Sequence, residues 1–241
     1  IGAALLSLLA AVTLFGARPE GNLYLRVDDF NLYLIVLNNL VSFTTSLFSA
    51  SYIAHELESG RLTPQYLRFY HAMYQALIFA MNLALLANNI GLLWVAIELA
   101  TLITVLMVGL YRTRAALEAA WKYFILGSLG IALALFGTIL VYLAAQPVIG
   151  EGLPAMAWDQ LLAHAAAFDP ALLNLAFVFL LLGYGTKAGL VPLHAWLPDA
   201  HAEGPTPISA VLSGLLLNVA LYAVLRFKML MSANPAALAP G

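Results

Sequence analysis

Charged side chains inside long apolar segments are the first candidates for chemistry in this sequence. Three of them stand out, and they are Glu98, Lys122 and Lys187. An ionisable side chain at the centre of a bilayer costs about 2.5–3.5 kcal/mol on insertion scales, so such groups are expected to face one another or water. A lysine near a carboxylate could therefore load and release a proton as the two move. The simpler alternative is a buried Glu–Lys pair that only holds helices together.

The segment that carries Lys187 has an irregular composition for a helix. Gly183, Gly185 and Gly189 surround the lysine, and Pro192 has no N–H to donate to the carbonyl four residues earlier. We predict a break or bulge between Lys187 and Pro192. Helices broken at membrane depth build the ion sites of many transporters, although a kink can also be purely structural.

Titratable side chains continue after the expected break. His194 follows Lys187 by seven residues, which would place both on one face of a continuous helix. Imidazole titrates near neutral pH, so His194, His201 and Asp199 could pass a proton onward. The spacing matches neither HExxH nor a zinc-finger pattern, and nothing indicates that His71 and His194 face each other across a haem. We therefore predict no bound metal and no cofactor in this chain.

The overall composition shows where these residues must work. Of 241 residues, 63% are hydrophobic and 9% are charged, and the mean hydropathy is +0.92. Soluble domains carry about 25% charged residues, so this is a membrane protein. The absence of cysteine excludes iron–sulfur clusters and thiolate zinc sites, which places any redox centre in another subunit. A net charge of −2 offers no basic surface for nucleic acid.

Long apolar stretches predict an all-α, polytopic transmembrane helix bundle of about seven spans. The predicted spans are residues 1–15, 30–54, 70–87, 90–111, 115–145, 171–197 and 207–230. The two-residue break at Asn88 and Asn89 predicts an antiparallel pair of helices. Residues 154–168, around Trp158, predict a short helix lying on the membrane surface.

The ends of the sequence indicate a fragment. It begins at Ile1, without an initiator Met and inside an apolar run, and it ends in a segment of small residues and prolines. We expect residues 1–241 to form a single membrane domain that is truncated at both ends.

Three motifs resemble the antiporter-like membrane subunits of respiratory complex I, membrane-bound nickel–iron hydrogenases and multi-subunit cation/proton antiporters. The longest runs from Lys187 through His194, Asp199 and His201 to Leu216 (KAGLVPLHAWLPDAHAEGPTPISAVLSGLL). The other two are WVAIEL, which contains Glu98, and AWKYFILGS, which contains Lys122. Within that family, the resemblance is strongest to the hydrogenase-4 type.

The resemblance implies a larger fold with inverted five-helix repeats, and residues 70–230 would be the first repeat. It also implies roles for single positions. Glu98 would be the glutamate that is typical of the family. Lys122 would be a cation that modulates transport, and Lys187 would be the lysine that loads the proton on a broken helix. His194 and His201 match histidines of the family, whereas Asn218 stands where complex I subunits carry a further lysine.

Two functions follow from these observations. The first is a proton-translocating subunit of a redox-driven complex of the hydrogenase-4 or NADH dehydrogenase type, with no redox centre in this chain. Its partners would be other membrane and peripheral subunits, the lipid bilayer and protons, and its location the inner (plasma) membrane. The alternative is a subunit of a secondary sodium/proton antiporter without redox chemistry, and an inert scaffold is the third possibility.

Overall fold

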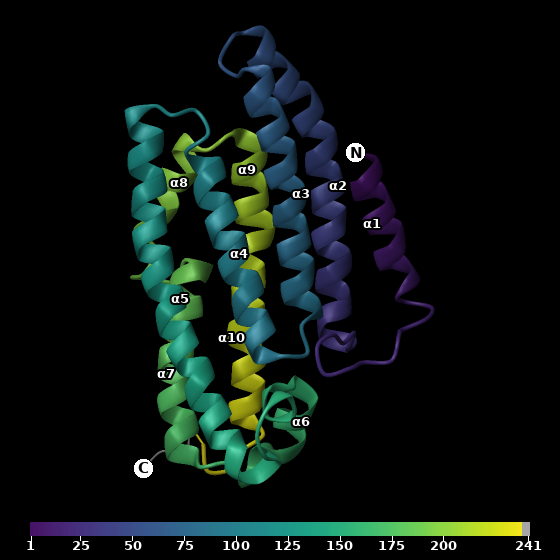
Figure 1. The fold of residues 1–241 in the computed structure, drawn as a ribbon, viewed down its shortest axis with the longest axis vertical. Helices are drawn as coiled ribbons and strands as arrows, with labels where there is room; N and C mark the ends of the chain where they lie inside the picture. Colours follow the sequence, from purple (N-terminus) through teal and green to yellow (C-terminus); the bar gives the residue numbers. More distant parts are fainter. Residues whose placement is uncertain (238–241) are drawn as a thin grey trace.

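The computed structural model describes residues 1–237, which form a bundle of helices running up and down one long axis (Figure 1). Six helical segments in this part of the chain are long and apolar enough to cross a membrane. They are α2 (Asp29–Glu58), α3 (Pro64–Leu86), α4 (Ile90–Val108), α5 (Arg114–Ile149), α7 (Pro170–Ala188) and the continuous run Thr206–Ser232. A further apolar helix, α1 (Gly2–Thr13), is shorter.

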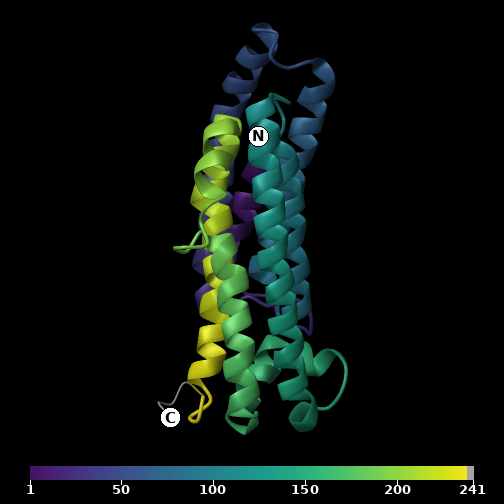
Figure 2. The ribbon, with the colours of Figure 1, turned by 90° about the vertical axis from the view of Figure 1, so that its left-hand side faces the viewer.

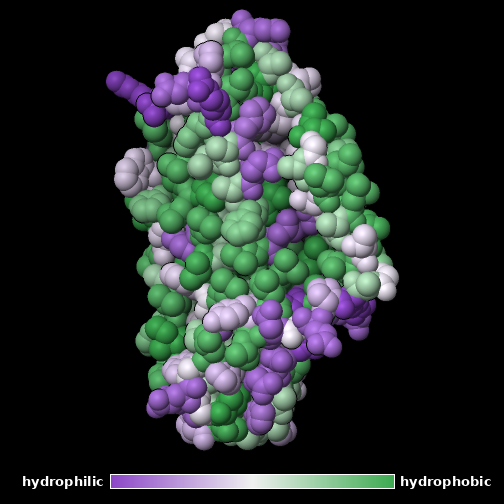
Figure 3. Space-filling view, turned by 45° about the vertical axis from the view of Figure 1, so that its right-hand side comes forward, coloured by the Kyte–Doolittle hydropathy of each residue, from purple (hydrophilic) through white to green (hydrophobic). Residues whose placement is uncertain are grey.

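These helices confirm the predicted polytopic bundle, with α1 as a short seventh element. On the face drawn in Figure 3, hydrophobic side chains dominate the middle of the bundle, as a bilayer requires, and most hydrophilic ones lie toward its two ends. The helices α2 and α5 are longer than predicted. Because α2 continues to Glu58, four residues past the predicted end, charged side chains near that end belong to the helix.

The predicted antiparallel pair is confirmed, and it is made by α3 and α4. Asn89 caps α4, since its side-chain oxygen accepts hydrogen bonds from the backbone N–H groups of Gly91 and Leu92, both at 3.0 Å. Asparagine is a favoured residue at this position because its side chain satisfies N–H groups that have no partner within the helix. The polar dipeptide 88–89 therefore ends one span and starts the next.

Close packing of α5 against α7 depends on small residues. A methyl group built on Gly183 of α7 would lie 2.5 Å from the carbonyl oxygen of Gly130 on α5. A methyl group built on Gly137 would lie 2.9 Å from the carbonyl oxygen of Ala176. Small residues let two transmembrane backbones approach closely, and here they bring the side chains of α5 directly against those of α7.

The predicted span 171–197 is wrong at its end, because α7 stops at Ala188. Gly189 adopts a left-handed conformation (φ 74°), and Leu190 N–H donates to the Gly185 carbonyl at 2.9 Å while Gly189 N–H donates to that of Thr186 at 3.2 Å. This is a Schellman motif, which requires a residue that tolerates positive φ. The predicted break is thus confirmed, but Gly189 makes it before Pro192 is reached.

After the break, the chain leaves the bundle in a loop that protrudes at about mid-height (Figure 2). It returns through α8 (Leu197–Glu203) and enters α9 (Thr206–Val211). A five-residue π-helical turn (Leu212–Leu216) joins α9 to α10 (Leu217–Ser232), so the predicted span 207–230 is one helix with an internal irregularity. The lysine at the end of α7 therefore lies about halfway along the bundle.

The predicted short helix near Trp158 is also present, as α6 (Trp158–His164) between two 3-10 turns (Leu153–Met156 and Ala165–Ala167). Its buried residues, Trp158 and Leu161, face the end of the bundle. The Trp158 ring meets that of Phe227 edge-on, with centroids 6.5 Å apart. This element therefore covers one end of the helix bundle (Figure 1).

Candidate functional site

Lys187 is the centre of the candidate site, because its side chain is fully buried (0% exposed) one residue before α7 ends. Its ammonium donates a hydrogen bond to the hydroxyl of Tyr123 on α5. It also lies 4.3 Å from the centroid of the Tyr123 ring and 5.7 Å from that of Trp196. A hydroxyl and two aromatic faces therefore surround the ammonium, and no carboxylate in residues 1–237 forms an ion pair with it.

The groups around Lys187 are themselves held in place. The Tyr123 hydroxyl is 2.7 Å from the Thr104 hydroxyl on α4. The Trp196 ring stacks on the Tyr123 ring with centroids 4.5 Å apart, and its indole N–H donates to the Thr186 carbonyl at 2.9 Å. Trp196 thus caps the broken end of α7 and packs against the partner of Lys187. The lysine, its partner and the helix break form one connected unit.

Glu98 belongs to the same region but does not touch Lys187. The two side chains are close enough to interact electrostatically, and Glu98 also interacts with Tyr123. One carboxylate oxygen, Oε2, is buried without a hydrogen-bond partner among residues 1–237. The sequence predicts that the charged side chains face one another or water. In this part of the chain no direct ion pair joins Glu98 to Lys187, since the Tyr123 hydroxyl accepts the hydrogen bond from the ammonium instead.

Lys122 lies outside this cluster, contrary to the expectation of a buried charge. Its side chain is 48% exposed and pairs with Glu118 at 2.8 Å and with Asp199 at 2.9 Å. Lys122 is exposed because it lies only two turns into α5, on a different side of the helix from Tyr123, which points into the bundle. The Lys122–Asp199 pair ties α5 to α8, the helix that follows the break.

The two histidines lie on the path that follows the break. His194 does not share a helical face with Lys187, because α7 ends between them, so that prediction is wrong. Its ring is half-buried, and Nδ1 is buried without a partner in the protein. His201 lies on α8, where burial lowers its pKa, and its backbone carbonyl accepts from the Ser209 hydroxyl at 2.9 Å. The lowered pKa means that burial favours the neutral form of the His201 ring.

The same region shows no ligand set for a metal. In residues 1–237, no three His, Asp or Glu side chains are grouped closely enough to hold an ion. Asn218, the position that departs from the family pattern, donates to the Gly214 carbonyl of its own helix at 2.7 Å. Its side chain is exposed on α10.

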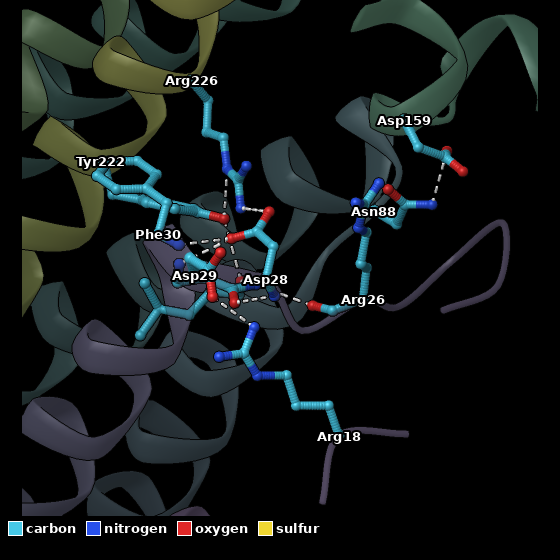
Figure 4. Close-up of polar contacts among 11 residues, drawn as sticks. Arg18, Arg26, Asp28, Asp29, Phe30, Asn88, Asp159, Tyr222 and Arg226 are labelled. Carbon is cyan, nitrogen blue, oxygen red and sulfur yellow. Dashed lines mark hydrogen bonds and ion pairs between the residues drawn. The ribbon is translucent and has the colours of Figure 1, made fainter. Parts of the chain in front are cut away.

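Sequence reasoning missed a second buried cation, Arg226. It pairs with Asp28 at 2.6 Å, and its Nε donates to the Tyr222 hydroxyl at 2.8 Å (Figure 4). Its guanidinium also contacts the rings of Phe30, Trp158 and Tyr222. Asp28 also caps α2 by accepting from the backbone N–H groups of Phe30 and Asn31. The only available signal was that Arg226 falls inside the predicted span 207–230.

Two further buried polar features were also missed. Glu56 near the end of α2 is buried, and one of its oxygens accepts from Arg61 at 3.3 Å. An amide cluster joins α2 to α3, where Asn38 and Asn39 both donate to the side-chain oxygen of Asn82, at 3.0 and 2.9 Å. Three asparagines within apolar stretches were a usable signal, because buried amides in membrane helices pair across helices.

Comparison with known proteins defines the family to which this chain belongs. Residues 87–239 match the family model described as "NADH:quinone oxidoreductase/Mrp antiporter, TM". This segment contains Glu98, Lys122, Lys187 and the two histidines. The chain belongs to this family of antiporter-like membrane subunits.

Individual relatives show which members of the family this chain resembles. The chain is 68% identical over 228 residues to the hydrogenase-4 component F homolog of Methylacidiphilum infernorum (isolate V4), covering 95% of this chain and 48% of that protein. It is 33% identical over 220 residues to NADH-quinone oxidoreductase subunit N of Paenibacillus sp. (strain JDR-2), covering 90% of this chain and 39% of that protein. The predicted resemblance to the hydrogenase-4 type is thereby confirmed.

A solved structure supports the fold. A chain of the membrane-bound sulfane sulfur reductase, an archaeal respiratory membrane complex, superimposes with a TM-score of 0.81 at 23% identity, over 98% of this chain and 47% of that one. This chain therefore spans about half the length of the relatives it matches.

Proposed function

We propose that this chain is the proton-translocating part of a membrane subunit in a redox-driven complex of the hydrogenase-4 or NADH dehydrogenase type. The observation that carries the proposal is Lys187, a fully buried basic side chain at a helix break with which no carboxylate in residues 1–237 forms a direct ion pair. An isolated charge of this kind is costly in a membrane and usually has a function. The 68% identity to a hydrogenase-4 component F homolog supports the same assignment.

In this proposal, Glu98 controls the proton on Lys187. An ammonium and a carboxylate stabilise each other's charged forms, so a shift of Glu98 toward the lysine favours the protonated state and a shift away favours release. The Tyr123 hydroxyl accepts a hydrogen bond from the ammonium and contacts the Thr104 hydroxyl, so it can stay bonded while the lysine gains or loses its proton.

The released proton would travel along the segment after the break. His194 has a buried Nδ1 without a protein partner, and such atoms are expected to bond water. His201 and Asp199 would continue the path, with Lys122 holding Asp199 at the exposed end. Asn218 cannot carry a proton, so transfer past α10 would depend on water.

The rest of the assembly is part of the proposal. Electron transfer and cofactors would belong to other membrane and peripheral subunits, and the complex would lie in the inner (plasma) membrane. Residues 70–230 would be the first of two inverted repeats in the longer subunit.

The test uses the full-length subunit in its assembled complex, in inverted membrane vesicles. We expect proton uptake when the native electron donor (hydrogen, formate or NADH) is added, with the same rate in sodium-free buffer. Proton movement that needs a sodium gradient and no electron donor would support the alternative, a secondary sodium/proton antiporter, whose family shares the matched model. If protons move under neither condition, the remaining interpretation is that this chain is an inert scaffold.

A further inference from the structure

A groove of about 530 Å³ opens on the outer face of the bundle formed by α3, α4 and α5. It lies toward the end of the bundle where α4 turns into α5, and Gly109, Leu110 and Arg112 of that turn line it. Most of its walls are apolar or aromatic, and they include Tyr66, Phe69, Val105, Leu106, Trp121 and Phe124. The groove is separate from the Lys187 site.

Arg112 is the one charged residue that lines the groove. Its guanidinium lies 5.1 Å from the centroid of the Tyr66 ring, and no carboxylate in residues 1–237 pairs with it. Its backbone adopts a positive φ of 54°, which is uncommon for a residue other than glycine. By contrast, Arg61, which lies between α2 and α3 at the same end of the bundle, pairs with Glu56 at 3.3 Å. The groove therefore combines an apolar wall with an uncompensated positive charge.

We propose that this groove binds an anionic phospholipid, with the phosphate against Arg112 and an acyl chain along the aromatic wall. Guanidinium groups bind phosphate through charge-assisted, often paired hydrogen bonds, and basic pockets between transmembrane helices hold lipid headgroups. Arg112 lies just beyond the apolar span of α4, at the level expected for a headgroup. Trp121, 61% exposed, and Leu106, 53% exposed, offer apolar surface below it.

A transmembrane helix of another subunit is the competing occupant. Such a helix would cover the apolar wall, but an apolar helix would leave the Arg112 charge uncompensated. A phospholipid would cover the apolar wall with its acyl chain and compensate the charge of Arg112 with its phosphate. It would also pack on the side of α5 opposite to Tyr123, because Trp121 and Phe124 flank that residue and line the groove.

The test measures lipid binding to the full-length protein in detergent by native mass spectrometry. Dioleoylphosphatidylglycerol is titrated in parallel with dioleoylphosphatidylcholine, and inorganic phosphate serves as competitor. We expect the anionic lipid to bind more tightly than the zwitterionic one and phosphate alone to leave it bound. Arg112→Gln should weaken the anionic lipid about tenfold, as loss of one charge-assisted contact predicts.

Two further variants separate this site from general electrostatic attraction. Arg114→Gln removes one positive charge from an exposed residue two positions away that does not line the groove, and it should bind lipid like the wild type. Val105→Phe keeps both arginines but fills the groove, and it should displace the lipid. Equal weakening by Arg112→Gln and Arg114→Gln, or unchanged binding in Val105→Phe, would overturn the proposal. So would a disulfide that an added oxidant forms, in the assembled complex, between the cysteine of Leu117→Cys and a cysteine on a helix of another subunit.

Discussion

Arg226 and Lys187 are both basic side chains buried in apolar surroundings, but the groups around them differ. Arg226 pairs with Asp28 at 2.6 Å and donates to Tyr222 (Figure 4), and it also contacts three aromatic rings. Lys187 has a tyrosine hydroxyl and two rings, while the nearby Glu98 keeps a buried oxygen without a partner. The first cluster is fully paired and joins helix ends, whereas the second is incompletely paired at a helix break. A cation with a fixed counter-ion holds structure, and a cation without one is free to change its protonation.

The largest effect on stability should come from Arg226. Arg226→Met leaves the Asp28 carboxylate without its counter-ion, and breaking a buried pair in this way costs about 3–5 kcal/mol. Thermal unfolding of the full-length protein in detergent measures the loss. Lys228→Met, an exposed residue two positions along the same helix, is the matched control and should change little. Equal unfolding temperatures for the two variants would show that the Asp28 cluster does not hold the bundle together.

Two buried tyrosines sharpen the comparison, because each one bonds a buried cation. Tyr123→Phe and Tyr222→Phe each remove a hydroxyl from a cation and should each cost about 1–3 kcal/mol of stability. Their effects on transport should differ. Proton uptake per assembled complex should fall in Tyr123→Phe and stay near wild type in Tyr222→Phe. Equal transport in both variants would mean that Tyr123 is structural.

A smaller effect is expected at the cap of the broken helix. Trp196→Phe keeps a ring against Tyr123 but loses the bond from the indole N–H to the Thr186 carbonyl, worth about 0.5–1.5 kcal/mol. Hydrogen exchange should speed up at residues 186–190. Trp94→Phe loses a similar bond, to the Ile131 carbonyl at 2.8 Å, and should leave exchange at 186–190 unchanged. Matching exchange profiles in the two variants would refute the capping role.

The smallest effect is expected from Lys122. It is exposed and paired with Glu118 and Asp199, and exposed ion pairs contribute little to stability. We expect Lys122→Gln to retain at least half of the wild-type proton uptake, with Glu118→Gln as the matched control. Abolished uptake in Lys122→Gln alone would assign Lys122 a central role, beyond the modulating role that the family resemblance implies.

Most of the fold was predictable because long apolar runs, polar breaks and glycine positions are local signals. The antiparallel pair at Asn88 and Asn89 and the break after Lys187 both followed from such signals. The predicted end of that span, at Leu197, was wrong because residues 190–197 remain apolar although they form a turn. Hydropathy cannot distinguish a protruding apolar loop from a helix. The π-helical turn at 212–216 had no local signal that we could recognise.

The candidate site was predictable in its residue types but less so in its contacts. Glu98 and Lys187 stood out because each is a charge within an apolar run. Tyr123 did not stand out, because a tyrosine in a membrane helix is common and its role depends on the close approach of α5 and α7. The same limit applies to Arg226, whose partner Asp28 lies on a helix far away in the sequence. Tertiary packing decides which charges are paired.

Proton uptake by complexes that carry changes at Lys187 tests the central claim most directly. The measurement uses inverted vesicles driven by the native electron donor, with the amount of assembled complex determined separately. We predict that Lys187→Ala assembles but does not take up protons, and that Lys187→Arg also fails, because arginine keeps its charge and cannot release a proton. Normal proton uptake by fully assembled Lys187→Ala would contradict the account and leave this chain as a scaffold.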